Sequence, residues 1–204
     1  MSARVPIGIS ARHVHLCQAD LEKLFGSGYT LTPTKPLSQP GQFACAETVE
    51  VHGPRGFFPK VRILGPLRER TQIEIARSDA FVLGLDPPVR DSGDLDGTPG
   101  VRLVGPAGEA ELAQGVIIAQ RHLHLHTAEA EQLGLKDKEL ISVRIDGMRA
   151  LIFENVLVRV GPRYAMDLHL DTDEANAAGA KNGDLATILA KEKKILGVNG
   201  NAHI

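Results

Sequence analysis

The chain of 204 residues is long enough for one large domain or two small ones, and too long for a miniprotein held together by disulfides. Its 23 basic and 25 acidic residues give a net charge of −2, which excludes bulk attraction to nucleic acid or to a membrane. Two cysteines exclude a disulfide framework, and no apolar run suits a membrane span or a secretory signal, so we expect a cytoplasmic protein.

The first half of the chain predicts short strands and one short helix. Alternating apolar residues and frequent Gly and Pro favour β structure, while the spacing at 18–25 predicts an amphipathic helix. A polar, turn-rich segment at 86–100 is expected to connect two halves or to form a mobile loop beside a site. The predicted strands cover 5–15, 48–51, 61–64 and 72–75.

The second half repeats this order. A strand at 115–124 precedes a helix at 128–133, and a basic tail at 191–204 ends the chain. The remaining predicted strands cover 141–145, 156–160 and 166–170.

An internal repeat explains the similar order of the two halves. Residues 9–24 align with 118–133 with eight identities in sixteen positions, and 62–75 resembles 158–170 at a slightly different offset. The prediction is therefore a mainly β protein made of two tandem small β-barrels, or sandwiches, from an internal duplication, capped by short α-helices. The expected domains are 1–112 and 113–190, before the tail.

Each half carries a His-x-His pair on a predicted strand. Side chains two residues apart point to the same face, roughly 6.5 Å apart at about 3.3 Å per residue, so both imidazoles can reach one metal ion. The second repeated block supplies a third ligand in each half, Glu74 in one and His169 at the aligned position of the other. The two predicted metal sites, with zinc favoured by the imidazole ligands, are His13, His15 and Glu74, and His122, His124 and His169.

Other readings of these histidines stay open at this point. They could be structural core residues, or they could bind metal ions that only stabilise a barrel without catalytic activity. A cupin-like mononuclear iron protein also places His-x-His on strands. Cys17 and the aligned His126 are reserve ligands, with turn or core roles favoured for both.

A local excess of positive charge surrounds Glu74. Segment 55–77 has a net charge of +4 in a chain of −2, and guanidinium groups match phosphate oxygens in pairs. Arg68 follows the turn at Gly65 and Pro66 and precedes the strand that carries Glu74, so we expect it to hold an anionic substrate. Arg12 and Arg121 alternate to the opposite strand face, where a role in the fold is expected.

Long motifs resemble a known family. The segments 6–16, 65–81, 121–124 and 167–176 closely resemble the phosphate propanoyltransferases, phosphotransacylases associated with bacterial microcompartments and with propanediol degradation. The resemblance runs from about residue 5 to 190. It implies two β-barrels, with exchange of the N-terminal strand between them left open. It also implies two zinc ions per chain and reversible transfer of a short acyl group between coenzyme A and phosphate.

The resemblance also implies roles for individual residues. The two triads would bind zinc, and Arg68 would bind phosphate. Family members carry an amphipathic extension before the first strand, whereas four residues precede Val5 here, so the cytoplasm is expected and the microcompartment lumen is the alternative. A homo-oligomer and a zinc-dependent thioester hydrolase remain open. Coenzyme A would contact Ile9, Ser10, Ala11, Arg55, Arg62 and Asn176, with Lys35, Leu64 and Phe81 as further candidates.

Overall fold

Residues 3–189 are described by a computed structural model, and over this range the chain is mainly β, with fifteen strands and four short helices. The predicted tail at 191–204 lies outside the described residues. The helices are α1 (Gln18–Phe25), α2 (Arg77–Leu83), α3 (Thr127–Leu133) and α4 (Thr172–Ala178). The strands are β1 (Arg4–Ser10), β2 (His13–His15), β3 (Pro33–Pro36), β4 (Phe43–His52), β5 (Phe57–Gly65), β6 (Gln72–Glu74), β7 (Val89–Arg90), β8 (Val101–Val104), β9 (Glu109–Leu112), β10 (Val116–Ala119), β11 (His122–Leu125), β12 (Leu140–Ile145), β13 (Leu151–Val160), β14 (Asp167–Asp171) and β15 (Leu185–Ile188).

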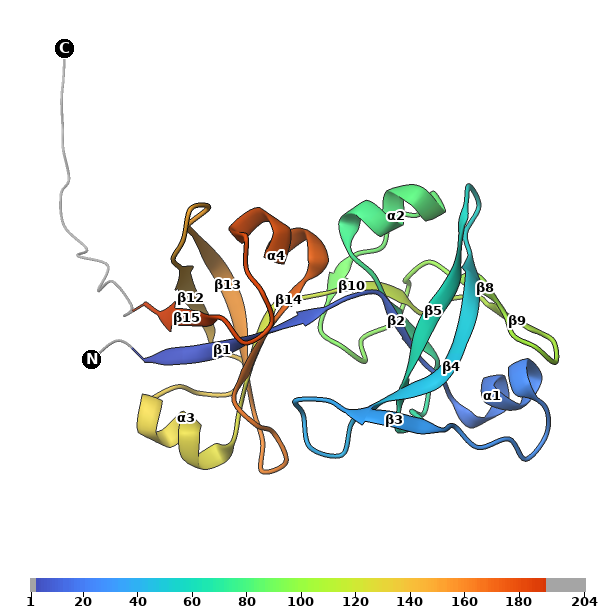
Figure 1. The fold of residues 1–204 in the computed structure, drawn as a ribbon, viewed down its shortest axis with the longest axis horizontal. Coiled ribbons are helices and arrows are strands. Elements are labelled where there is room, and N and C mark those ends of the chain that lie inside the picture. The colour runs from blue at the N-terminus through green and yellow to red at the C-terminus, as the bar shows by residue number, and fades with distance from the viewer. Residues whose placement is uncertain (1–2, 190–204) are drawn as a thin grey trace, which may run out of the picture.

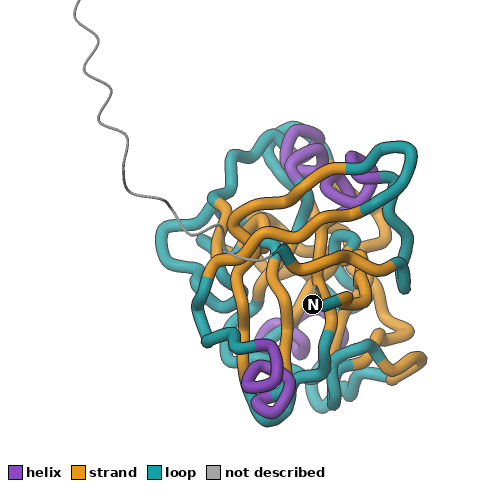
Figure 2. The backbone as a smooth tube through the Cα atoms, turned by 90° about the vertical axis from the view of Figure 1, so that its left-hand side faces the viewer, coloured by secondary structure: helices purple, strands orange, loops and turns teal. Residues whose placement is uncertain are grey.

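The strands form two lobes that lie side by side (Figure 1). In one lobe the order β1-β14-β11-β13-β12-β15 closes into a six-stranded barrel. In the other, nine strands make a curled sheet with β7 and β9 at the ends of its main path, so this half-barrel does not close as the first does. The expectation of a mainly β fold with short capping helices is confirmed, and the helices lie at the periphery of the strands (Figure 2).

Each lobe has its own apolar core, as the alternation of apolar residues predicted. Val14, Ile63 and Ile73 are buried in the core of the curled sheet, and Val5 and Leu168 in that of the barrel. Burying such a side chain stabilises the fold by about 1.5–3 kcal/mol.

The leading strand of each half pairs in the other half's sheet. Strand β1 runs parallel to β14, with Ile7 opposite Leu168, and antiparallel to β15, so it completes the barrel. Strand β10 runs parallel to β6, with Val116 opposite Ile73. Strands β2 and β11 directly follow these two crossing strands, and the His-x-His pairs that they carry line one shared cavity. The boundaries 1–112 and 113–190 stay predictions.

Arg12 holds the start of α2 to the sheet. Its guanidinium pairs with the carboxylate of Asp79 at 2.5 Å and lies 4.2 Å from the centre of the Phe58 ring. The other Asp79 oxygen accepts the backbone N–H of Ala76 before the helix, which satisfies a donor that the helix leaves unpaired.

The same arrangement recurs at α4. Arg121 pairs with Glu174 at 2.9 Å and lies 5.3 Å from the ring of Phe153, while Glu174 accepts the backbone N–H of Asp171. Arg12 and Arg121 therefore support the fold, as expected, although they lie just before β2 and β11 and not on a strand.

Candidate functional site

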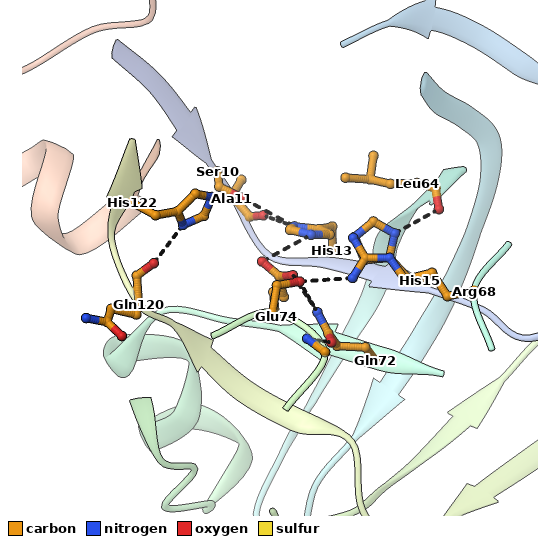
Figure 3. Close-up of polar contacts among 12 residues, drawn as sticks. Ser10, Ala11, His13, His15, Leu64, Arg68, Gln72, Glu74, Gln120 and His122 are labelled. Carbon is orange, nitrogen blue, oxygen red and sulfur yellow. Dashed lines mark hydrogen bonds and ion pairs between the residues drawn. The ribbon is translucent and has the colours of Figure 1, made fainter. Parts of the chain in front are cut away.

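The first predicted triad is assembled by two neighbouring strands. His13 and His15 lie on β2, and antiparallel pairing places Glu74 of β6 directly opposite His13. All three are buried, and Nε2 of His13 lies 3.5 Å from Oε2 of Glu74 (Figure 3). One donor atom from each of the three side chains lies within 4.8 Å of the others, which suits a shared metal ion.

Backbone carbonyls orient the two imidazoles of this triad. Nδ1 of His13 donates to the carbonyl oxygen of Ala11 at 2.9 Å, and Nδ1 of His15 donates to that of Leu64 at 3.2 Å (Figure 3). Because Nδ1 carries the proton, each Nε2 is unprotonated and has a lone pair that can bind a metal. Burial, followed by the nearby His13 and Arg68, lowers the pKa of His15 to about 3, so this ring is neutral and able to bind a metal at neutral pH.

The second predicted triad is built in the same way. His122 and His124 lie on β11, and antiparallel pairing places His169 of β14 opposite His122. Nδ1 of His122 donates to the carbonyl oxygen of Gln120 at 2.7 Å, and its Nε2 lies 3.0 Å from Nε2 of His124. Two ligands on one zinc at about 2.1 Å in tetrahedral geometry are separated by about 3.4 Å, so the convergence of these nitrogens fits a metal.

The electrostatics of the second triad also favour neutral ligands. Burial, then His169, lowers the pKa of His122 to about 4, and burial, then His122, lowers that of His124 to about 2. Nδ1 of His124 is buried and has no hydrogen-bond partner over the described residues. Both donor sets therefore suit a metal ion, as predicted from the repeat.

Two residues that the sequence analysis missed orient the third ligand of each triad. Nε2 of Gln72 donates to Oε1 of Glu74 at 2.5 Å, and at the aligned position Oδ2 of Asp167 accepts Nε2–H of His169 at 3.0 Å. An amide donor thus faces the carboxylate ligand, and a carboxylate acceptor faces the imidazole ligand. The signal was present in the sequence, because both residues precede the third ligand by two positions and so share its strand face.

One cavity of about 810 Å³ is lined by all six triad residues. Arg68 also lines it and donates from Nη1 to Oγ of Ser92 at 2.9 Å and from Nη2 to Nε2 of His15 at 2.8 Å. Arg68 would have to release His15 for that nitrogen to bind a metal. The structure thus brings Arg68 to the first triad, and Ser92 is a neighbour that only the folded chain reveals.

The predicted coenzyme A residues fall into two groups. Ile9, Ser10, Ala11, Arg62, Lys35 and Leu64 line the cavity. Arg55, Phe81 and Asn176 are not among its lining residues: the Arg55 guanidinium lies 5.5 Å from the centre of the Phe81 ring on α2, and Asn176 lies on α4. Figure 1 shows these two helices on the same side of the molecule.

Neither reserve ligand belongs to a triad. Nδ1 of His126 accepts the backbone N–H of Ala128 at 3.2 Å, which caps α3, and Sγ of Cys17 lies 3.4 Å from a carboxylate oxygen of Asp20. The favoured turn role of His126 is confirmed. Within residues 3–189, no helix combines the length and apolar character that crossing a membrane requires.

Comparison with known proteins agrees with this geometry. The family model described as phosphate propanoyltransferase matches residues 6–181. A phosphate propanoyltransferase of Thermotoga maritima is 55% identical over 184 residues, which cover 90% of this chain and 88% of the relative. Those of Salmonella typhimurium and Rhodopseudomonas palustris are 50% and 46% identical, covering 87% and 92% of this chain and 85% and 83% of the relatives. The chain belongs to the phosphate propanoyltransferase family.

Proposed function

We propose that this enzyme reversibly converts a short-chain acyl-CoA and phosphate to an acyl phosphate and coenzyme A, at a site that holds two zinc ions. The observation that carries the proposal is that both triads and Arg68 line the same cavity. Zinc bound at the triads would supply Lewis-acid stabilisation of the thiolate and of the carbonyl oxygen. The three-ligand sets leave coordination positions for substrate.

The residues of the chain have separate roles in this reaction. Arg68 binds phosphate and directs one of its oxygens at the thioester carbonyl carbon. A carbon–oxygen bond forms, the carbon–sulfur bond breaks, and the electron pair leaves with the sulfur of coenzyme A. The hydroxyl of Ser92, which donates to Oε1 of Glu74 at 2.9 Å while accepting from Arg68, keeps the guanidinium beside the first triad.

Coenzyme A would extend from this centre along β1. Backbone groups of residues 9–11 and the side chain of Arg62 line the cavity and are proposed contacts. Nη1 of Arg62 donates to the carbonyl oxygens of Cys45 and Ala46, which holds its guanidinium in place. Arg55 and Asn176 lie outside the cavity lining, so we assign them to the distant part of the cofactor, with Phe81 beside Arg55.

The reverse reaction tests this proposal most selectively. Purified protein mixed with propanoyl phosphate or acetyl phosphate and coenzyme A is expected to form the corresponding thioester, which is followed by chromatography. A hydrolase with the same metal centre transfers acyl groups to water and makes no thioester. Loss of the acyl phosphate without thioester formation would therefore contradict the proposal, and the ratio of the two thioesters gives the preferred acyl chain.

A further inference from the structure

Two adjacent residues after β7 each contact one arginine. Oγ of Ser92 accepts a hydrogen bond from Nη1 of Arg68 at 2.9 Å, and Oδ1 of Asp91 lies 3.5 Å from Nη1 of Arg159. Arg68 follows β5 in the first half of the chain, whereas Arg159 lies on β13 in the second. The dipeptide thus brings guanidinium groups from the two halves to one place, and both line the large cavity.

Arg159 stands beside the second triad as Arg68 stands beside the first. Parallel pairing of β11 and β13 places it opposite His124. Its guanidinium lies 5.8 Å from the ring centre of Tyr164, and that ring lies 4.5 Å from the ring of His124. Each triad therefore has one arginine next to its second histidine, although the two arginines do not occupy aligned positions of the repeat.

The positive charge of these two arginines is only partly balanced. Asp91 also pairs through Oδ2 with Nζ of Lys138 at 2.5 Å, so one carboxylate serves two cations. Glu74 accepts hydrogen bonds from the neutral groups of Gln72 and Ser92, and its negative charge also acts on Arg68. Burial lowers the pKa of Arg68, Glu74 opposes this shift, and the nearby positive charge of Arg159 adds to it. The charged residues that line the cavity are mostly basic, and this excess of positive charge suits a small multivalent anion: Arg12, Lys35, Arg62, Arg68 and Arg159 face two carboxylates, Glu74 and Asp167.

We propose that Arg159 is the second arginine of the phosphate site, so that the transferred phosphate is held between Arg68 and Arg159, one from each half. Two guanidinium groups that each donate a pair of hydrogen bonds fix both the position and the rotation of a tetrahedral anion, which a single guanidinium group does not. The inference rests on the phosphate-dependent acyl transfer proposed above. The inference adds Arg159 to the site, a residue that belongs to neither triad and lies outside the basic segment at 55–77.

The test compares Arg159→Ala, Arg159→Lys and a matched control, Lys138→Ala. Lys138 shares Asp91 with Arg159, yet it is not among the residues that line the cavity. Binding of inorganic phosphate to the metal-containing protein is measured by calorimetry, and KM values for phosphate and for propanoyl-CoA are measured separately. Arg159→Ala is expected to weaken phosphate binding and raise the phosphate KM by about 10–100-fold, with the propanoyl-CoA KM changed by less than about 3-fold. Arg159→Lys recovers part of the loss, and Lys138→Ala leaves both values near wild type.

Several outcomes would overturn the inference. Unchanged phosphate binding in Arg159→Ala refutes it, as does an equal rise in both KM values. If Arg159→Ala does not fold, Arg159→Lys provides the test. A lysine ammonium group cannot form the paired hydrogen bonds of a guanidinium group, so this variant must still bind phosphate more weakly than wild type. If the wild-type protein transfers acyl groups to phosphate and Arg159→Ala has the same phosphate KM, the role of Arg159 is refuted and the proposed function is not. Wild-type protein that binds no phosphate refutes the proposed function as well.

Discussion

Ser78 and Asp173 occupy aligned positions of the two halves and bind each other across the junction of the lobes. The backbone N–H of Ser78 donates to Oδ2 of Asp173 at 2.8 Å, and its hydroxyl donates to Oδ1 at 2.6 Å. This contact joins α2 of the first half to α4 of the second half. The carboxylate also satisfies an unpaired N–H at the start of α2.

Replacing Asp173 with alanine should therefore loosen the junction. The loss of two hydrogen bonds to a charged acceptor, one of them at a helix start, is expected to lower the free energy of unfolding by about 1 kcal/mol, measured by urea denaturation. The matched control is Asp86→Ala, which removes an exposed ion pair with Arg77 and should change stability far less. Equal stability changes in the two variants would contradict this role of Asp173.

Each triad should lose its own metal when one histidine is removed. His13→Ala and His122→Ala each leave two ligands in the altered site, too few for a stable zinc site, and leave the other triad intact. Elemental analysis is expected to show about one zinc fewer per chain in each variant, with none retained in the double variant. Retention of the full metal content by either single variant would show that these residues are not the ligands.

Gly8 should be sensitive because Asp167 packs against it. A Cβ atom at Gly8 would lie 2.6 Å from Oδ2 of Asp167, the oxygen that accepts the proton of His169. Gly8→Ala is therefore expected to displace this carboxylate and to weaken zinc binding at the second triad by about 10–100-fold, with the first triad unaffected.

Asp167→Asn provides the comparison for Gly8→Ala, because it removes the charge without adding an atom near β1. Chelator competition measures both sites. If Gly8→Ala binds zinc like wild type while Asp167→Asn does not, the prediction for Gly8 is wrong. The contact between the new Cβ atom and Asp167 would then be relieved without moving His169.

Arg68 should matter for phosphate rather than for coenzyme A. Arg68→Ala removes charge-assisted hydrogen bonds to the anion, and the KM for phosphate is expected to rise by about 10–100-fold. Arg70→Ala is the control, since Arg70 lies two residues away and pairs with the exposed Asp96. A larger effect of Arg70→Ala than of Arg68→Ala on phosphate KM would contradict the assignment.

The sequence predicted which residues form the two candidate metal-binding triads, because the repeat supplied two independent copies of each position. His13 and His122 are oriented by the carbonyl two residues earlier in both halves, so period-two spacing was enough to predict their face. The pairing of β1 in the barrel of the second half could not be derived from alternation, because alternation specifies a face and not a partner strand.

Residues contributed by loops and by the other half were harder to predict. Ser92 has no repeated partner, and its role depends on the path of a turn-rich segment that periodicity does not describe. Arg159 looks like an ordinary charged residue on an alternating strand, and only the pairing of β11 with β13 places it near His124. Gln72 and Asp167 were predictable in principle, since they share a face with the third ligands.

The most direct measurement is the release of free thiol from propanoyl-CoA and acetyl-CoA by the purified protein, with and without phosphate, together with metal analysis of the same sample. We expect thiol release that requires phosphate, from protein that contains about two zinc ions per chain, as the two three-ligand sets predict. Equal release without phosphate would mean that water is the acceptor. No release from folded, zinc-containing protein would mean that the cavity binds its ligands without catalysing transfer.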